Sequence, residues 1–228
     1  MNIVALTDIH GDTNQLTSVE GELSSADMVL LVGDITHFGR IEDAEKVIRS
    51  VRRFNDQVFA IAGNCDFPEV NDYLENEDID LHGKCRSIKG ISFIGIGGSL
   101  PCPGRTPNEL SENAFSALLD RAVSGLTSEM PGILVSHQPP FGTLNDTVGG
   151  GDHVGSKAIR TFIEEREPVI CFTGHIHEAA GTDHIGKTTV VNPGPFRGGS
   201  YAVAEVGAKL SLLEIRNAVL RYNRQMPE

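Results

Sequence analysis

The sequence predicts an α/β fold in which a partly parallel sheet is covered by helices. Apolar runs and amphipathic stretches alternate through the first half in the order strand, helix, strand, helix, strand, an order typical of such a sheet. The 228 residues allow one well-buried core, and the 25 glycines suit a fold of many strands and tight turns. Because no internal repeat or Pro/Ser-rich linker interrupts the chain, we expect a single domain spanning residues 1–228.

The first half contains three predicted strands separated by two predicted helices. The strands are short apolar runs at residues 3–7, 28–32 and 58–62. The first helix is expected at residues 12–23, with Asp12 or Thr13 as its N-terminal cap. The second is expected at residues 41–54, where apolar side chains recur every three or four residues and form one face.

The second half continues the pattern with longer loops. A strand at residues 91–96 leads into a polar loop, after which Ser111 caps a helix that ends near residue 123. The Gly-rich stretch 145–153 is expected to be mobile, and a helix follows at residues 154–165. Five more strands are expected, the last three antiparallel and joined by short turns, at residues 132–136, 169–173, 185–191, 201–206 and 209–215. The tail from residue 217 fits either a last strand or a short helix.

The charge balance argues against several classes of function. With 31 acidic residues against 19 lysines and arginines, the formal net charge is −12, which disfavours a nucleic-acid-binding surface.

No apolar window approaches the roughly 18 residues of a membrane span, and the amino terminus lacks the features of a signal peptide. The four scattered cysteines form no C-x-x-C pair, so we expect reduced thiols in a cytoplasmic protein.

Residues that commonly bind metals occur in five turns, each of which follows an apolar run. In open sheets, ligand sites collect at the carboxyl ends of the strands. Taken singly, each aspartate or asparagine is an ordinary turn residue and each histidine an ordinary loop residue. Together they indicate a two-metal centre, and the five turns are Asp8-Ile9-His10, Gly33-Asp34, Gly63-Asn64-Cys65-Asp66, Ser136-His137-Gln138 and Gly174-His175-Ile176-His177.

The ligand chemistry narrows the choice of metal. Imidazole, carboxylate and amide oxygen suit manganese, iron, zinc, cobalt or nickel, and we expect two divalent ions with manganese as the first choice. A metal pair about 3.5–4 Å apart needs a bridging ligand, and the two carboxylate oxygens make Asp34 the candidate. Two such cations, two aspartates and a hydroxide leave the site at about +1, which attracts an anion such as a phosphate ester.

The complete set of turns resembles the motif set of the calcineurin-like metallophosphoesterases. The blocks occur in the right order and span about three quarters of the chain. The resemblance implies a four-layer α-β-β-α sandwich with two mixed sheets and a dimetal site at the sheet edges. It also implies that a hydroxide between the metals attacks phosphorus in line, with both metals stabilising the developing charge.

The resemblance assigns the ligands position by position. One metal would take Asp8, His10, Asp34 and His177, and the other would take Asp34, Asn64, His137 and His175. The catalytic set it implies comprises His137, Asp34, Asn64, Cys65 and Asp66.

One position departs from the family pattern. The usual block is Gly-Asn-His followed by an acidic residue, and that histidine helps to protonate the leaving group or to hold the phosphate, whereas this chain has Cys65. A thiol is a weak hydrogen-bond donor and a poor general acid. The Gly-Asn-Cys-Asp variant resembles a bacterial and archaeal branch often linked to phosphodiesterase activity. We therefore expect better turnover of esters with good leaving groups than of alkyl phosphates.

Several other residues have both a functional and a structural interpretation. Asp66 either orients a ligand as an outer-shell group or caps a helix near residue 67. For His153, a solvated surface position is favoured over closure on the substrate, and for Arg105 and Arg197 a solvated side chain is favoured over a phosphate clamp. Three histidines match no motif and are interpreted as structural: His37, His82 and His184.

The leading hypothesis is a metal-dependent phosphoesterase that acts on a small phosphorylated substrate, with a phosphodiester preferred. A phosphomonoesterase or nucleotide phosphatase is the nearest alternative, and a nuclease is disfavoured by the acidic composition. A non-catalytic protein-binding scaffold is the alternative from another class, against which every ligand position is filled. The apolar strand at residues 91–96 and the late strands either fill the core or form the interface of a homo-oligomer.

Overall fold

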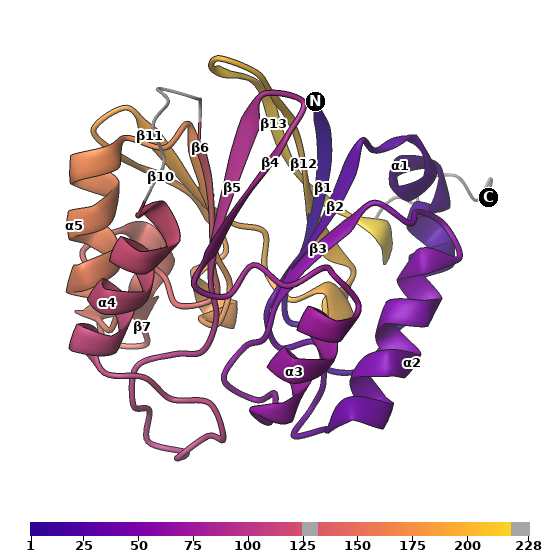
Figure 1. The fold of residues 1–228 in the computed structure, drawn as a ribbon, viewed down its shortest axis with the longest axis horizontal. Helices are drawn as coiled ribbons and strands as arrows, with labels where there is room; N and C mark the ends of the chain where they lie inside the picture. Colours follow the sequence, from indigo (N-terminus) through magenta and orange to yellow (C-terminus); the bar gives the residue numbers. More distant parts are fainter. Residues whose placement is uncertain (125–131, 220–228) are drawn as a thin grey trace.

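The computed structural model describes residues 1–124 and 132–219. Two mixed sheets pack face to face, and helices cover the outer face of each, so the chain forms four layers in the order α-β-β-α (Figure 1). This confirms the expected architecture with two mixed sheets. Among the described residues, no helix combines the length and apolar character that crossing a membrane requires.

The first sheet contains the three strands predicted in the first half of the chain. Strands β1, β2 and β3 run parallel, with β3 at one edge, while β12 pairs antiparallel with β1 and β13 antiparallel with β12. In spatial order the strands are β13 (Leu210–Asn217), β12 (Ser200–Val206), β1 (Asn2–Leu6), β2 (Met28–Val32) and β3 (Val58–Ile61).

The second sheet is also parallel in its centre and antiparallel at both edges. The pairs β11–β9, β9–β6 and β6–β5 are parallel, whereas β10 and β4 pair antiparallel with their single neighbours. In spatial order the strands are β10 (Gly181–Ile185), β11 (Thr188–Asn192), β9 (Ile170–Phe172), β6 (Gly132–Ser136), β5 (Ile91–Ile96) and β4 (Lys84–Ile88).

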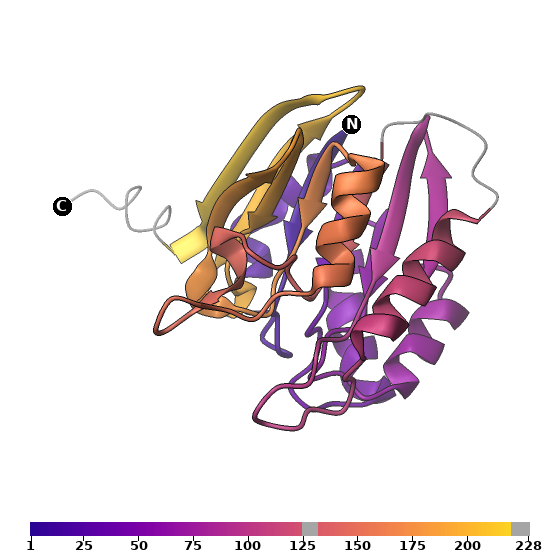
Figure 2. The same cartoon turned by 90° about the vertical axis from the view of Figure 1, so that its left-hand side faces the viewer.

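Three apolar clusters separate the four layers. Along β2, Leu30 faces the cluster between the sheets while Leu31 faces the cluster under the first helical layer, as the two-residue period of a strand requires. That layer comprises α1 (Glu20–Ser25), α2 (Ile41–Arg52) and α3 (Glu69–Asn76). The third cluster lies beneath α4 (Glu112–Val123) and α5 (Lys157–Arg166), which Figure 2 shows side by side on the second sheet.

Most predicted elements are confirmed within two or three residues, but the prediction of the first helix is wrong. A 3₁₀ turn at Leu16–Val19 precedes the short α1, so the helix covers only the end of the predicted range. Neither Asp12 nor Thr13 caps it, because the Asp12 carboxylate instead accepts a hydrogen bond from Asn14 N at 3.0 Å and closes a local turn.

The late strands also differ from the prediction. The predicted strand 185–191 is interrupted at Gly186, whose φ of +58° forms the turn between β10 and β11. These two strands belong to the second sheet and β12 and β13 to the first, so they do not form one antiparallel set. β11 pairs parallel with β9. Residues 220–228 of the tail lie outside the described residues.

The stretch expected to be mobile is a small hairpin, formed by β7 (Thr147–Val148) and β8 (Asp152–His153). The buried carboxylate of Asp146 holds its base by accepting hydrogen bonds from the backbone of Gly142, Thr143 and Gly155 at 2.9–3.0 Å. The edge strand β4 was not predicted, because its residues are only partly buried and lack a clear apolar alternation.

Candidate metal centre

The predicted ligands lie where parallel strands of both sheets end. Asp8 and His10 follow β1, Asp34 follows β2 and Asn64 follows β3, all in the first sheet. In the second sheet, His137 follows β6, and the segment bearing the last two histidines follows β9. The face-to-face packing of the sheets therefore brings together side chains from opposite ends of the sequence.

Glycines next to the ligands allow the turns to approach one another closely. A Cβ added at Gly33 would lie 2.3 Å from His137 Nδ1, and one at Gly63 would lie 2.1 Å from Asp34 N. A Cβ at Gly174 would lie 1.9 Å from Thr7 Oγ1. Any side chain at these positions would push one ligand turn away from another.

Several ligand residues themselves adopt the left-handed backbone region. The φ angles of Asp8, His10, Asp34 and His175 are +53°, +50°, +49° and +67°. Such conformations cost of the order of 1–3 kcal/mol each for residues other than glycine, and they cluster at functional sites. Backbone hydrogen bonds hold them, including those from Asp8 N to Gly33 O at 3.1 Å and from His10 N to Asp34 O at 2.8 Å.

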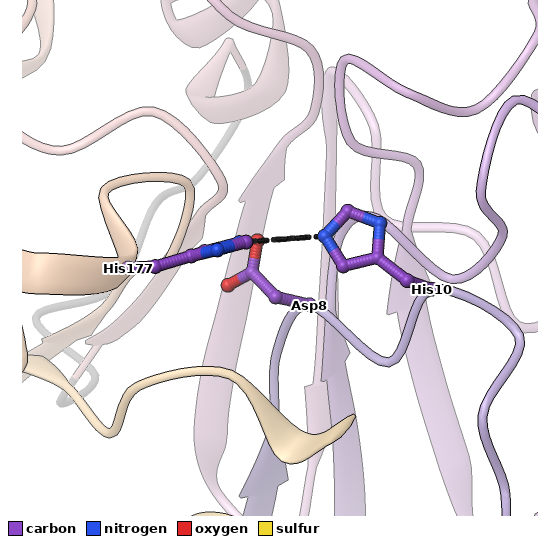
Figure 3. A group of neighbouring side chains, drawn as sticks. All are labelled: Asp8, His10 and His177. Carbon is purple, nitrogen blue, oxygen red and sulfur yellow. Dashed lines mark hydrogen bonds and ion pairs between the residues drawn. The ribbon is translucent and has the colours of Figure 1, made fainter. Parts of the chain in front are cut away.

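The first half of the site, which we call the open half, is formed by Asp8, His10 and His177 (Figure 3). The Nε2 atoms of the two histidines face each other at 3.3 Å, and Asp8 Oδ1 lies 3.2 Å from His177 Nε2. The other oxygen of Asp8 accepts hydrogen bonds from Thr7 Oγ1 at 2.7 Å and from His175 N at 3.3 Å. These contacts leave Asp8 Oδ1 directed at the two imidazoles.

The second half, which we call the buried half, is formed by Asn64, His137 and His175. His137 Nδ1 donates to Val32 O at 2.9 Å, so its Nε2 points at Asn64 Oδ1, 3.0 Å away. The His175 ring packs against the His137 ring with centroids 5.3 Å apart. The backbone carbonyl of Val32 thus fixes which nitrogen of His137 faces the site.

Asp34 lies between the two halves. Its Oδ1 is 3.4 Å from His137 Nε2, and its Oδ2 is 3.7 Å from His10 Nε2. Cys65 N donates to Oδ1 at 2.8 Å and fixes the plane of the carboxylate. One oxygen therefore faces each half, which is the arrangement that a bridging ligand needs.

Burial and charge set the protonation states of these side chains. Burial opposes the charged form of Asp34, but the charge of His137 and its hydrogen bond outweigh burial and hold the Asp34 pKa well below its usual value. Burial alone would lower the His137 pKa, but the charge of Asp34 raises it to about 9. Burial, followed by the charge of His137, lowers the pKa of His175 to about 4, which leaves that imidazole neutral.

Asp66 ties two ligand turns together from behind. Its fully buried carboxylate accepts hydrogen bonds from Thr36 N at 2.7 Å, Thr36 Oγ1 at 2.7 Å, Ile35 N at 3.1 Å and Gly63 N at 2.7 Å. It therefore joins the turn after Asp34 to the turn before Asn64. The alternative that Asp66 caps a helix is wrong, because α3 begins at Glu69 with Pro68 as its N-cap and no side-chain capping bond.

Cys65 lies beside Asp34, where the two halves meet, and its surroundings do not suit acid catalysis. Its thiol is within 4.8 Å of the ligand atoms of His10 and Asp34, and Asn64 Nδ2 donates towards its sulfur at 3.6 Å. Burial and then the negative charge of Asp34 raise the pKa of the thiol. The Cys65 thiol is therefore a poor proton source here.

The donor set fits divalent cations. Asp8 and Asp34 are only 1% and 2% exposed, and among the described residues neither forms an ion pair with a lysine or arginine. Buried carboxylates require a compensating charge, and the ligand atoms of Asp8, Asp34 and His137 lie within 4.8 Å of one another. Oxygen and imidazole donors in this number match the ligands that manganese, iron, zinc, cobalt and nickel accept.

The structure distinguishes among the remaining candidates. His153 Nδ1 lies 2.7 Å from the Asp146 carboxylate at the base of the hairpin. Arg105 is exposed in the loop before α4 and contacts no predicted ligand among the described residues. Arg197 is exposed, as expected, and lies beside the site, with Nη2 3.3 Å from His177 Nδ1.

Two supporting residues were not predicted from the sequence. Thr7 donates to Asp8, and Asn192 Nδ2 donates to Ile176 O at 2.8 Å, between the two histidines of the last turn. Thr7 stands directly before Asp8, and Asn192 opens the run Asn192-Pro193-Gly194-Pro195. That run was the available signal for Asn192, because its turn residues mark a fixed loop.

Comparison with known proteins agrees with the geometry. The sequence pattern of the family described as calcineurin-like phosphoesterase matches residues 1–179. An uncharacterised protein of Methanocaldococcus jannaschii is 39% identical over 221 residues, which cover 94% of this chain and 96% of that protein.

Solved structures share the fold at lower identity. A protein of Thermus thermophilus superposes with a TM-score of 0.75 at 20% identity, over 95% of this chain and 98% of that one. A dimetal phosphatase from Danio rerio has a TM-score of 0.62 at 11% identity, over 96% of both chains. With the metal-ligand geometry and the family match in agreement, the chain belongs to the calcineurin-like phosphoesterase family and is a metal-binding hydrolase of phosphoric esters.

Proposed function

We propose that the protein is a phosphodiesterase that uses two divalent metal ions, with manganese the first choice, to hydrolyse a small phosphorylated substrate. The observation that carries the proposal is the placement of Asp34, whose two oxygens face His137 on one side and His10 on the other. A bridging carboxylate between two sets of imidazole and oxygen ligands is what a two-metal phosphoesterase requires.

Each half of the site would hold one ion. Asp8, His10, Asp34 and His177 would bind the ion of the open half, and Asp34, Asn64, His137 and His175 would bind the ion of the buried half. When bound, the ions would supply an activated water and electrostatic stabilisation of the phosphoryl group. Val32 O keeps Nε2 of His137 directed at the site, and Asp66 keeps the Asp34 and Asn64 turns at a fixed separation.

The chemistry of Cys65 supports a restricted choice of leaving group. A buried thiol is a weak hydrogen-bond donor and a poor general acid for a departing alkoxide. Esters whose leaving group is already a weak base need no such proton. We therefore expect aryl esters to be cleaved faster than alkyl esters.

A phosphomonoesterase or nucleotide phosphatase remains the nearest alternative, and a protein-binding scaffold the alternative from another class. The scaffold is disfavoured because no ligand position is replaced by an unsuitable residue. We further propose a cytoplasmic, single-domain protein: β12, which lies beyond the residues matched by the family pattern, pairs with β1 in the first sheet, and the four cysteines are free.

The test is to strip the protein with chelator, restore manganese, and compare an aryl phosphodiester with the matching aryl monoester. We expect manganese-dependent turnover of the diester that is lost in His137→Ala. Faster turnover of the monoester would change the substrate class, and activity of neither ester with metal bound would favour the scaffold. Unchanged activity in His137→Ala would contradict the assignment of the site.

A further inference from the structure

A row of side chains crosses the open half of the site. The residues at its two ends have no role in the proposed chemistry. The row begins with Arg197, whose Nη2 is 3.3 Å from His177 Nδ1, and continues through the His177 and His10 rings, 5.3 Å apart. It ends with His37 and Phe38, with centroids 5.4 Å from His10 to His37 and 5.0 Å from His37 to Phe38. The metal-ligand pair thus has a cation at one end and aromatic rings at the other.

The cation is not neutralised by a carboxylate. Arg197 is exposed, and among the described residues no acidic group lies within ion-pair distance of it. Its turn is fixed, because Phe196 N donates to Thr7 O at 2.8 Å at the end of β1. In a protein of net charge −12, an arginine left unpaired beside a ligand histidine supplies local attraction for an anion.

Binding of a cation to His177 would also remove the hydrogen bond between His177 Nδ1 and Arg197. A histidine that binds a cation through Nε2 carries its hydrogen on Nδ1 and donates from that atom. Nδ1 of His177 can then no longer accept a hydrogen bond from the guanidinium. The planar fork of Arg197 is left to bind another acceptor, and phosphate oxygens match its geometry.

The aromatic end is exposed yet firmly held. Phe38 is 49% exposed, whereas the other nine phenylalanines, all in the part of the chain that the structure describes, are buried or half-buried. Its φ of +55° is unfavourable for a phenylalanine. The turn persists because Thr36 Oγ1 accepts from Gly39 N at 3.0 Å and donates to the buried Asp66 at 2.7 Å.

We propose that this row orients the substrate, with Arg197 binding the free phosphate oxygens and the His37–Phe38 pair packing against a planar ring of the ester group that stays on phosphorus, not of the leaving group. Offset or edge-on packing of such rings contributes to affinity beyond the buried area. Because Phe38 lies two ring contacts from His10, a nucleoside, whose sugar extends the reach of its base, fits better than a simple aryl group. The inference rests on the proposed phosphoesterase function and names the substrate class for that site.

The test measures binding to the manganese-loaded protein by calorimetry, with ligands that a phosphoesterase cannot cleave. The ligands are inorganic phosphate, methylphosphonate, benzylphosphonate and a nucleoside 5′-phosphonate. Arg197→Gln removes the cation and Phe38→Leu removes the ring while keeping apolar bulk. Arg105→Gln is the matched control, since Arg105 is an exposed loop arginine without a contact to the site. Thermal melts verify that all variants are folded.

We expect Arg197→Gln to weaken all four ligands by about tenfold or more, the loss of a charge-assisted hydrogen bond. Phe38→Leu should weaken only the ligands that carry a ring, by about three- to tenfold, with the larger loss for the nucleoside phosphonate. A larger loss for benzylphosphonate would overturn the choice of a nucleoside. Unchanged phosphate binding in Arg197→Gln, or an equal loss of all four ligands in Phe38→Leu, would overturn the proposed orientation.

Failure of the inference is distinguishable from failure of the proposed function. If the wild-type protein cleaves aryl esters and both variants bind all ligands as it does, only the inference is wrong. If the wild-type protein shows the expected binding pattern but cleaves no ester, the orientation stands and the catalytic function is wrong.

Discussion

The two halves of the metal centre use the same ligand chemistry in different surroundings. In the buried half, the His137 side chain is fully buried, and Val32 O and Asn64 occupy both of its nitrogens. In the open half, the His177 side chain is 31% exposed, and its second nitrogen faces the solvated Arg197. We infer a division of labour, in which the buried half would hold its ion firmly and the open half would admit the substrate.

The largest effects should come from two single variants, each of which removes one histidine from one half of the site. His137→Ala deletes a fully buried ligand, and we expect kcat to fall by about a thousandfold, the upper range for losing one electrostatic stabiliser. His177→Ala removes a partly exposed ligand, so added manganese should restore more of its activity. Steady-state rates across a manganese titration test this. Equal rescue of both variants would contradict the division between the halves.

Asp66 tests whether the buried half depends on support from behind. Asp66→Asn keeps the volume but turns an NH₂ group towards N–H and O–H donors. We expect manganese affinity to fall by about 10- to 100-fold, as for other outer-shell partners, measured by competition with a chelating dye. Asp72→Asn, at an exposed position on α3, is the control. Unaltered affinity in Asp66→Asn would remove Asp66 from the account.

Cys65 lies beside Asp34, where the two halves meet. Cys65→His introduces a group that can donate a proton, so alkyl-ester turnover should rise by about tenfold relative to aryl-ester turnover, less than a fully positioned general acid supplies. Cys65→Ser, which matches the thiol in shape and adds no acid, should leave the ratio unchanged. Similar rates for alkyl and aryl esters in the wild-type protein would contradict the interpretation of Cys65.

The smallest expected effect is on the number of protons that the protein releases when it binds manganese. Because the His137 pKa is about 9, its imidazole is protonated on both nitrogens at neutral pH in the metal-free protein. Metal binding at Nε2 must displace the proton on that nitrogen. Manganese addition in weak buffer should therefore release nearly one proton more from wild type than from His137→Ala. This difference should vanish above about pH 9, and metal affinity should fall as the pH is lowered.

The raised pKa of His137 affects the stability of the metal-free fold in the opposite direction: metal affinity rises with pH, whereas this contribution to stability falls. A pKa raised from 6.5 to about 9 stabilises the fold fully below pH 6.5, and the contribution is lost as the pH rises through 9. Metal-free His137→Ala should lack this pH dependence in thermal melts.

The strands and the turns that follow them could be predicted from the sequence because both are local signals. Each ligand turn is marked by an apolar run that ends in a glycine or a polar residue, as at Gly33-Asp34 and Gly63-Asn64. The prediction of the first helix failed because its apolar spacing spans a 3₁₀ turn and a short α-helix. The sheet membership of β11 and β12 could not be predicted, because it depends on long-range pairing across the two layers.

Residues around the ligands were harder to predict than the motif turns. Arg197 stands 20 positions from His177, and nothing local distinguishes it from the solvated Arg105. His37 and Phe38 carry no signal of their own, because an exposed aromatic residue in a turn is common in sequence. Their relation to His10 arises only from the meeting of the β1 and β2 turns.

A dimetal centre is tested most directly by the manganese content of the purified, reconstituted protein after dialysis, measured by mass spectrometry for wild type and His137→Ala. Two ions per wild-type chain, with a loss from the buried half in the variant, is the predicted result. One ion or none in the wild-type protein, or no change in the variant, would contradict a dimetal centre in which Asp34 joins two unequal halves.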